Sequence, residues 1–149
     1  MPTYADNPKA RFDYELLESF EAGLVLTGPE TKSIKTGKVS IKGSYVKILG
    51  GEAYLVGAII SPYQPGNPSA GGAADYDPQR SRKLLLKRSQ LKYLIGKSQE
   101  QGLSLIPIKL YNSHNLVKLE FAIARGKKKY DKREVIKQRE VERNLRRVK

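Results

Sequence analysis

The stretch YVKILGGEAYLVGAII, residues 45–60, decides the fold class of this chain. Two runs rich in β-branched and aromatic side chains, residues 45–49 and 53–60, flank the pair Gly50-Gly51. Such side chains favour strands, and glycines accept the positive φ angles of a tight hairpin turn. The stretch therefore predicts an antiparallel hairpin.

A second hairpin is predicted later in the chain. Residues 103–111 and 116–124 flank the turn-forming run NSHN, residues 112–115. In the later strand, four apolar residues (Val117, Leu119, Phe121 and Ile123) alternate with Lys118, Glu120 and Ala122. A period of two indicates a sheet with one face toward the core and one toward water. Residues 14–20 and 23–27 give a weaker first pair of strands.

Two helical segments interrupt these strands. Residues 29–35 form a short helix that ends before Gly37, and residues 80–101 form a long helix that ends at Gly102. One stripe of the long helix carries Leu84, Leu91 and Ile95, with Leu94 beside it.

The resulting order, β-β-α-β-β-α-β-β, predicts a mainly β fold. Six short strands joined by hairpins favour a small antiparallel barrel, because closure removes exposed strand edges. We expect an OB-like barrel of about six strands with two to three flanking helices over residues 1–125. A basic C-terminal tail follows over residues 126–149.

Charge is the strongest compositional signal. The formal net charge is +13, and residues 126–149, with eleven basic and four acidic side chains, carry +7 of it. Both parts are basic, which indicates a polyanionic partner. The sequence has no Cys, no apolar segment typical of a signal peptide and no apolar run that could span a membrane. We expect a soluble, cytoplasmic protein whose partner is not a membrane.

The reactive side chains argue against an enzyme. His114 is the single histidine, it falls in a predicted turn, and no thiol accompanies it in a metal site. Asp75 and Asp77 lie in residues 61–78, whose Gly, Pro and Ala content favours a surface loop over a clamp. We expect His114 to face solvent in a turn, Asp77 to serve a turn or helix cap, and no catalytic residue, metal or cofactor.

The segment DPQRSRKLLLKRSQLKYLIGK, residues 77–97, concentrates positive charge, which beyond the opening Asp77 only Glu100 opposes. Its basic residues are Arg80, Arg82, Lys83, Lys87, Arg88, Lys92 and Lys97. Uncompensated repulsion between these side chains favours contact with RNA or DNA. A solvated helix face is the alternative interpretation.

The tail, GKKKYDKREVIKQREVERNLRRVK, is too poor in apolar side chains to fold alone. In a helical conformation it would align a basic row along one side, formed by Lys132, Arg139, Arg143 and Arg146. Phosphates along that row would supply the stabilisation that an isolated helix lacks. We expect an arm that is disordered when free and folds on RNA; a solvated tail without a partner is the alternative.

Several strings together resemble one known family. FEAGLVLTGPETKSIKTGK (residues 20–38), GSYVKI, GEAYLVGA, DPQRSRKLLLKR and ARGKKKYDKRE occur in the order found in SmpB, the SsrA-binding protein family, and span nearly the whole chain. In series, FEAG, RKLLL and GKKKYDKR are specific to that family. The chain departs from the pattern after Tyr111, where a Trp is common, and in a longer loop over residues 64–76.

The resemblance implies a trans-translation factor with an OB-like barrel. Members of this family bind the tRNA-like part of transfer-messenger RNA and deliver it, with elongation factor Tu and GTP, to stalled ribosomes. Their C-terminal tail probes the empty message channel, so that the nascent chain is tagged and the ribosome rescued. A structural ribosomal protein with a basic extension is the competing interpretation, and a nuclease is a third.

The resemblance also implies RNA-binding residues. Matched motif by motif they are Asn7, Glu21, Leu85 and Lys118, to which we add the basic residues Lys32, Arg80, Arg82, Lys83, Lys127 and Lys128. The carboxylate of Glu21 can accept hydrogen bonds from base amino groups or a ribose hydroxyl. Leu85 can offer an apolar surface to an unstacked base, although without the resemblance core packing is the favoured interpretation.

In the tail the resemblance implies contact with the ribosomal decoding centre and message channel. The matched residues are Gly126, Tyr130, Asp131, Lys132 and Arg133, to which the basic row of the helical tail adds Arg139, Arg143 and Arg146. Gly126 would free the backbone where the arm leaves the last strand, and Tyr130 would stack on a ribosomal RNA base.

Overall fold

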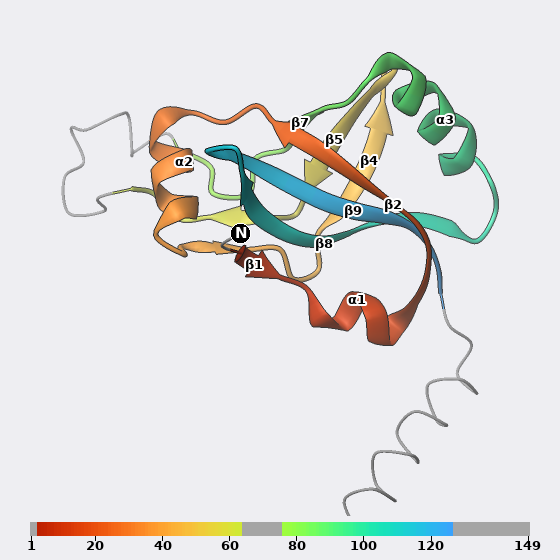
Figure 1. The fold of residues 1–149 in the computed structure, drawn as a ribbon, viewed down its shortest axis with the longest axis horizontal. Coiled ribbons are helices and arrows are strands. Elements are labelled where there is room, and N and C mark those ends of the chain that lie inside the picture. Colours follow the sequence, from red (N-terminus) through yellow and green to blue (C-terminus); the bar gives the residue numbers. More distant parts are fainter. Residues whose placement is uncertain (1–2, 64–75, 127–149) are drawn as a thin grey trace, which may run out of the picture.

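The computed structural model describes residues 3–63 and 76–126, whose arrangement is shown in Figure 1. Its elements in chain order are β1 (Thr3–Asp6), α1 (Pro8–Asp13), β2 (Tyr14–Leu24), α2 (Gly28–Lys35), β3 (Val39–Ser40), β4 (Tyr45–Leu49), β5 (Glu52–Val56), β6 (Ile59–Ile60), β7 (Arg82–Leu85), α3 (Arg88–Ser98), β8 (Leu103–Ser113) and β9 (Leu116–Gly126).

Six strands close into an antiparallel barrel. The main sheet runs β1-β8-β4-β5-β7-β2-β9, and β9 pairs back with β8, so that β8, β4, β5, β7, β2 and β9 form a ring. Long ladders join β2 to β9 and β9 to β8, whereas β4 meets β8 through one residue couple, Val46 with Leu105. The prediction of a mainly β barrel of about six strands is confirmed.

Apolar side chains from the strands fill the ring. Leu55, Leu110, Leu119 and Phe121 are each at most 1% exposed, and burial of one such side chain contributes ~1.5–3 kcal/mol. The predicted core-facing set of β9 is confirmed, since Val117 and Ile123 are buried with Leu119 and Phe121.

Helix α1 covers part of the barrel's outside. Its Ala10 packs with Ile106 of β8 and Ala124 of β9 in a small second cluster. The face of β9 that was predicted to face water is therefore only partly exposed to solvent, because α1 covers Ala124. Neither β1 nor α1 was expected from the sequence, since PKARFD is too short to show a helical period.

The short helix predicted at residues 29–35 is confirmed as α2. Thr27 begins it with a capping box: the Thr27 hydroxyl accepts from the Glu30 amide at 3.2 Å, and the Glu30 carboxylate accepts from the Thr27 amide at 3.0 Å. Ile34 of α2 and Leu94 of α3 are fully buried and anchor their helices to the barrel. None of the helices described in residues 3–63 and 76–126 has the length and hydropathy needed to cross a membrane.

The long helix predicted over residues 80–101 is wrong in its first half. Residues 82–85 form strand β7, which pairs with β5 and β2, and α3 begins only at Arg88. Leu84 is buried as a strand residue, and Leu94, not Leu91 or Ile95, is the fully buried residue of α3. The spacing of the apolar residues therefore resembled one continuous helix, although it spans the strand β7 and the helix α3.

The pair of strands predicted at residues 14–20 and 23–27 is also wrong. Strand β2 continues through Glu21-Ala22-Gly23 and pairs with β9 and then β7, so no turn interrupts it. Gly23, inside this continuous strand, lies opposite both Lys118 of β9 and Leu85 of β7.

Both predicted hairpins are confirmed, with shifted ends. β4 and β5 pair around Gly50-Gly51, and residues 59–60 form the separate strand β6, which pairs with β3. β8 and β9 are joined by a two-residue turn at His114 and Asn115, whose φ angles are 51° and 65°. His114 is exposed in this turn, as predicted.

Candidate nucleic-acid interface

Three sequence-distant RNA-binding candidates, Leu85, Glu21 and Lys118, meet on one surface of the barrel. They lie on the neighbouring strands β7, β2 and β9, and β8 follows next to β9 (Figure 1). We call this surface the outer face; it comprises Leu85, Glu21, Gly23, Lys118, Glu120, Lys109 and Tyr111. Gly23 lies opposite both Leu85 and Lys118, and Lys118 lies opposite Tyr111. The flanking residues Leu84, Ala22, Leu119 and Leu110 are buried, so strand alternation directs the outer-face side chains away from the core.

A hydrogen bond orients the carboxylate of Glu21. The Tyr111 hydroxyl donates to Glu21 Oε2. Burial, the hydrogen bond and the negative charge of Glu21 raise the pKa of Tyr111, so its hydroxyl stays a donor in the neutral pH range. Lys109 lies 5.2 Å from the centroid of the Tyr111 ring and 3.9 Å from the carboxylate of Glu120. The free lone pairs of Glu21 are thus presented in a fixed direction.

Gly23 places no side chain between Leu85 and Lys118. A Cβ at residue 23 would lie 3.5 Å from the Leu85 Cβ and 3.7 Å from the Lys118 ammonium. Leu85 is 53% exposed. The outer face therefore combines an apolar surface, a cation and an oriented acceptor, which suit a base, a phosphate and a base amino group or ribose hydroxyl, respectively.

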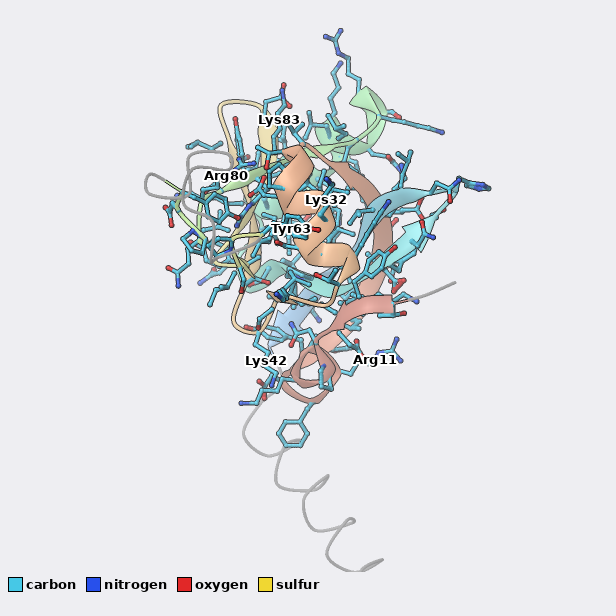
Figure 2. All side chains as sticks on the ribbon, turned by 90° about the vertical axis from the view of Figure 1, so that its left-hand side faces the viewer. Arg11, Lys32, Lys42, Tyr63, Arg80 and Lys83 are labelled. Atoms are coloured by element: carbon cyan, nitrogen blue, oxygen red, sulfur yellow. The ribbon has the colours of Figure 1, made fainter. Side chains whose placement is uncertain are left out.

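A second group of candidates surrounds α2, and Figure 2 shows Lys32, Tyr63, Arg80 and Lys83 in this region. The Lys32 ammonium lies 5.5 Å from the centroid of the Tyr63 ring. Lys83 of β7 lies 3.7 Å from the carboxylate of Glu52. Both side chains of this ion pair are about two-fifths exposed. These cations can neutralise phosphates beside the outer face without reading a sequence.

Arg82 does not have the surface role that its charge suggested. Its side chain is fully buried and lies 2.8 Å from the carboxylate of Glu30, which is 1% exposed. Each of its guanidinium nitrogens has protein acceptors: Glu30, the Tyr76 hydroxyl and the carbonyls of Ala58 and Pro78. The prediction that Arg82 contacts RNA directly is therefore wrong, because no donor is left for a phosphate.

Glu30 is the centre of this buried network. Burial alone would raise its pKa, but hydrogen bonds from Arg80, the Thr27 amide and Arg82 outweigh burial and hold the pKa at about 2, below the ordinary 4.5. The expectation that Glu100 alone opposes the cations of residues 77–97 is wrong for Arg80 and Arg82, which pair with Glu30. The network joins α2 to the start of β7 and so holds Leu85 in position on the outer face.

Asn7 is buried at the junction between β1 and α1. It is 6% exposed, and its side-chain amide donates to the carbonyl of Pro107 at 3.0 Å. Its backbone amide donates to the carbonyl of Ile108 at 2.9 Å. The structure thus gives Asn7 a role in fastening the N-terminal segment to β8, and an RNA contact through Asn7 stays a prediction.

Asp77 serves a turn, as expected: its carboxylate accepts from the Gln79 amide at 2.9 Å. Asp75 lies outside the described residues, as does most of the predicted loop. The tail candidates beyond Gly126 lie outside them as well: Lys127, Lys128, Tyr130, Asp131, Lys132, Arg133, Arg139, Arg143 and Arg146. Gly126 itself is the last residue of β9 and pairs with Tyr14.

Tyr111 and Gly23 were missed as site residues by the sequence reasoning. A glycine inside a strand signals close approach of another group, and this signal was available at Gly23. Tyr111 lies two residues after Lys109, so both side chains point to the same face of β8. Its partner Glu21 is 90 residues away in the sequence, and only the strand order reveals their contact.

Comparisons with known proteins identify the family of this chain. The family model described as SmpB protein matches residues 4–149. The SsrA-binding protein of Geobacillus thermodenitrificans (strain NG80-2) is 48% identical over 144 residues, covering 97% of this chain and 90% of that protein. The SsrA-binding protein of Acaryochloris marina (strain MBIC 11017) is 46% identical, covering 97% and 91%.

A solved structure extends the likeness to three dimensions. A chain from the structure described as "tmRNA-SmpB: a journey to the center of the bacterial ribosome" superposes with a TM-score of 0.67 and 41% identity. The match covers 88% of this chain and 92% of that one. Identity over nearly the full length, together with a shared fold, leads to one conclusion: the chain belongs to the SmpB family.

Proposed function

We propose that this chain is a trans-translation factor that binds the tRNA-like part of transfer-messenger RNA and delivers it to stalled ribosomes. The observation that carries the proposal is the outer face, where Glu21, Leu85 and Lys118 converge from three strands around Gly23. The names of the relatives, SsrA-binding proteins, point to the same RNA as the partner of this surface.

The tail supplies the second half of the proposal. With a net charge of +7 over residues 126–149, it is attracted to RNA and enters the message channel when no messenger fills it. Elongation factor Tu with GTP accompanies the charged RNA, and the chain itself contributes binding rather than a catalytic step. Its place of action is then the cytoplasm.

A reconstituted tagging assay on ribosomes stalled at the end of a truncated message tests both halves. The full chain supports tagging and binds the tRNA-like RNA. A variant that ends at Gly126 keeps the RNA binding of the barrel and loses tagging. Glu21→Ala in the full chain loses both, because it removes the oriented acceptor of the outer face.

Two outcomes would count against the proposal. Tagging by the variant that ends at Gly126 would remove the tail from the mechanism. Copurification of the full chain with every ribosome in equal amount, without transfer-messenger RNA, would instead indicate a structural ribosomal protein.

A further inference from the structure

The outer face carries no net charge, although the chain as a whole has a formal charge of +13. Its charged side chains are two carboxylates, Glu21 and Glu120, and two ammonium groups, Lys109 and Lys118. A third carboxylate adjoins them, because Asp6 of β1 lies opposite Lys109. Long-range attraction of phosphates, which dominates RNA binding on a basic surface, is therefore not what this face offers.

Only part of the positive charge on the outer face is available to a phosphate. Lys109 is shared between two other groups, since its ammonium lies 3.9 Å from the carboxylate of Glu120 and 5.2 Å from the centroid of the Tyr111 ring. Among residues 3–63 and 76–126, no ion pair involves Lys118. The outer face can thus hold a phosphate through Lys118, and its remaining groups must recognise neutral parts of the RNA.

Apolar side chains surround Lys118. Leu85, Val25 and Leu116 are each about half exposed. Val25 comes two residues after Gly23, and its amide donates to a backbone carbonyl of β7 at 2.9 Å, so the strand geometry continues as far as this residue. Leu116 comes two residues before Lys118 in β9, so strand alternation places Val25 and Leu116 on the outer face as well. This surface suits the carbon atoms of riboses and bases.

The carboxylate of Glu21 is the oriented acceptor of this surface. Its Oε2 accepts from the Tyr111 hydroxyl, and no other side-chain hydrogen bond or ion pair of Glu21 occurs within the part of the chain that the structure describes. Oε1 is therefore open to a ligand. An ionised carboxylate only accepts, so the ligand atom that meets it must carry a hydrogen. The phosphodiester groups of RNA carry none and are excluded as partners of Glu21.

RNA has two kinds of donor, the N–H groups of its bases and its ribose 2′-hydroxyls. In a folded RNA most base donors are engaged in base pairs, whereas the wide, shallow minor groove of an A-form helix displays the 2′-hydroxyls. A guanine edge also presents two adjacent N–H donors, which match both oxygens of a carboxylate, and Tyr111 already bonds to one oxygen of Glu21. A hydroxyl needs a single oxygen. The remaining acceptor of Glu21 therefore suits a ribose better than a base.

We propose that Glu21, oriented by Tyr111, accepts a hydrogen bond from a ribose 2′-hydroxyl, so that the outer face recognises RNA by its sugar and discriminates against deoxyribose. Lys118 binds a phosphate nearby, and the apolar side chains on the adjacent strands β7, β2 and β9 contact ribose carbons (Figure 1). The proposal rests on the proposed function in taking the tRNA-like RNA as the ligand of this face, and it adds which atoms of that RNA Glu21 recognises.

Substitution with 2′-fluoro nucleotides tests the proposal, because fluorine removes the hydroxyl donor and preserves the sugar pucker of RNA. Each version of the tRNA-like RNA carries a 2′-fluoro group at a single position, and filter binding measures its affinity for the full chain. At the nucleotide that contacts Glu21 we expect the affinity to fall roughly tenfold, the lower end of the range for a hydrogen bond to a charged group. In the variant Glu21→Gln the same substitution should cost less than about twofold.

The variant Glu18→Gln is the matched control. It removes a carboxylate of the same strand that also accepts from a tyrosine hydroxyl, that of Tyr93, at 2.7 Å. This variant should retain both the RNA affinity and the tenfold effect of the 2′-fluoro group. A salt titration separates Glu21 from a phosphate contact: Glu21→Gln should leave the slope of log affinity against log salt unchanged, whereas Lys118→Gln should make it shallower by about 0.7–0.9.

The proposal is overturned if no position is sensitive to 2′-fluoro, or if every such effect persists in Glu21→Gln. It is also overturned if Glu21 couples to a base instead, so that inosine in place of guanosine, which removes the exocyclic amino group, weakens binding to the unaltered chain but not to Glu21→Gln.

An unrelated RNA hairpin, substituted in the same way, separates this proposal from the proposed function. If the chain binds that hairpin as tightly as the tRNA-like RNA, with the same coupling to Glu21, the recognition of the sugar is supported and the proposed function fails. Binding of neither RNA would refute both.

Discussion

Tyr111 and Glu21 are joined by a hydrogen bond although β9 lies between their strands. Tyr111 lies opposite Lys118 of β9 and Glu21 lies opposite Glu120 of β9, so the hydrogen bond runs diagonally over the face of β9. Tyr111 of β8 therefore orients the carboxylate of Glu21, the acceptor that we assign to RNA recognition. We expect the two residues to contribute to RNA binding together.

We expect Tyr111→Phe to weaken binding of the tRNA-like RNA about 3- to 10-fold, or about 1 kcal/mol, because the carboxylate loses its fixed direction. In a Glu21→Gln background the same change should cost almost nothing, and a double-mutant cycle measures this coupling. Tyr93→Phe is the control, since it removes a similar hydrogen bond of 2.7 Å to Glu18, outside the outer face. If the losses of RNA affinity in the two single variants were additive, Tyr111 and Glu21 would act independently and the prediction would be wrong.

Gly23→Ala should separate stability from binding. The new Cβ meets its neighbours at 3.5 Å or more, which is ordinary contact, so the strand gains rigidity and stability changes by about +0.4 to +1 kcal/mol. The methyl group also adds bulk between Leu85 and Lys118, and RNA affinity should fall several-fold. Thermal unfolding and filter binding measure the two effects, and unchanged affinity would mean that RNA does not approach this part of β2.

Glu30 should make the fold sensitive to acid. Its pKa is depressed from 4.5 to about 2 in the folded chain, so its contribution is complete above pH 4.5 and disappears as the pH falls toward 2. The shift corresponds to about 3 kcal/mol, of which about 2 kcal/mol should be lost by pH ~3. An NMR titration of the Glu30 carboxyl measures the pKa directly, and a midpoint near 4.5 would contradict the network.

Substitution tests the same network at neutral pH. Glu30→Gln leaves the buried Arg82 without its counter-ion and should cost about 3–5 kcal/mol in urea unfolding. Glu52→Gln breaks the exposed pair with Lys83 and should cost at most ~1 kcal/mol. Similar costs for the two variants would show that the buried pair does not stabilise the fold.

The turn between β8 and β9 holds two non-glycine residues at positive φ. Asn115→Gly should relieve part of this strain and stabilise the chain by about 0.5–1 kcal/mol, since glycine is favoured at the second position of such a turn. RNA binding should not change. A loss of stability in thermal unfolding would mean that the Asn115 side chain makes a contact worth more than the strain.

The sequence revealed features that depend on neighbouring residues. Gly50-Gly51, the alternation from Val117 to Ile123 and the capping residues Thr27 and Glu30 each act over a few positions, and the elements built on them were predicted or are readily rationalised. Strand β7 could not be found in this way, because Arg82 is placed by Glu30, 52 residues earlier. Without knowledge of that contact, Leu84 fits the apolar stripe of the helix predicted over residues 80–101.

The candidate site shows the same division. Glu21, Leu85 and Lys118 came from resemblance to a family, since neither charge nor periodicity distinguishes them from other surface residues. Their meeting around Gly23, and the part played by Tyr111, follow from the strand order β7-β2-β9-β8. Arg82 was misassigned because a cation in a basic segment is expected in water, whereas here its donors are satisfied inside the protein.

Strand β2 fixes the distance between the start of the tail and the candidate RNA-binding face. Tyr14, at one end, is paired with the residue from which the tail departs, and Glu21 lies seven positions further along the same strand. A bulge between Leu16 and Glu18 takes up one residue, so the two positions are six ladder steps apart, from Gly126 to Glu120 on the partner strand. At ~3.3 Å per step their separation along the strand is about 20 Å, and side-chain motion cannot alter it. The barrel thus acts as a rigid spacer, and wherever the bound RNA is seated, the starting point of the arm is carried to a fixed distance from it.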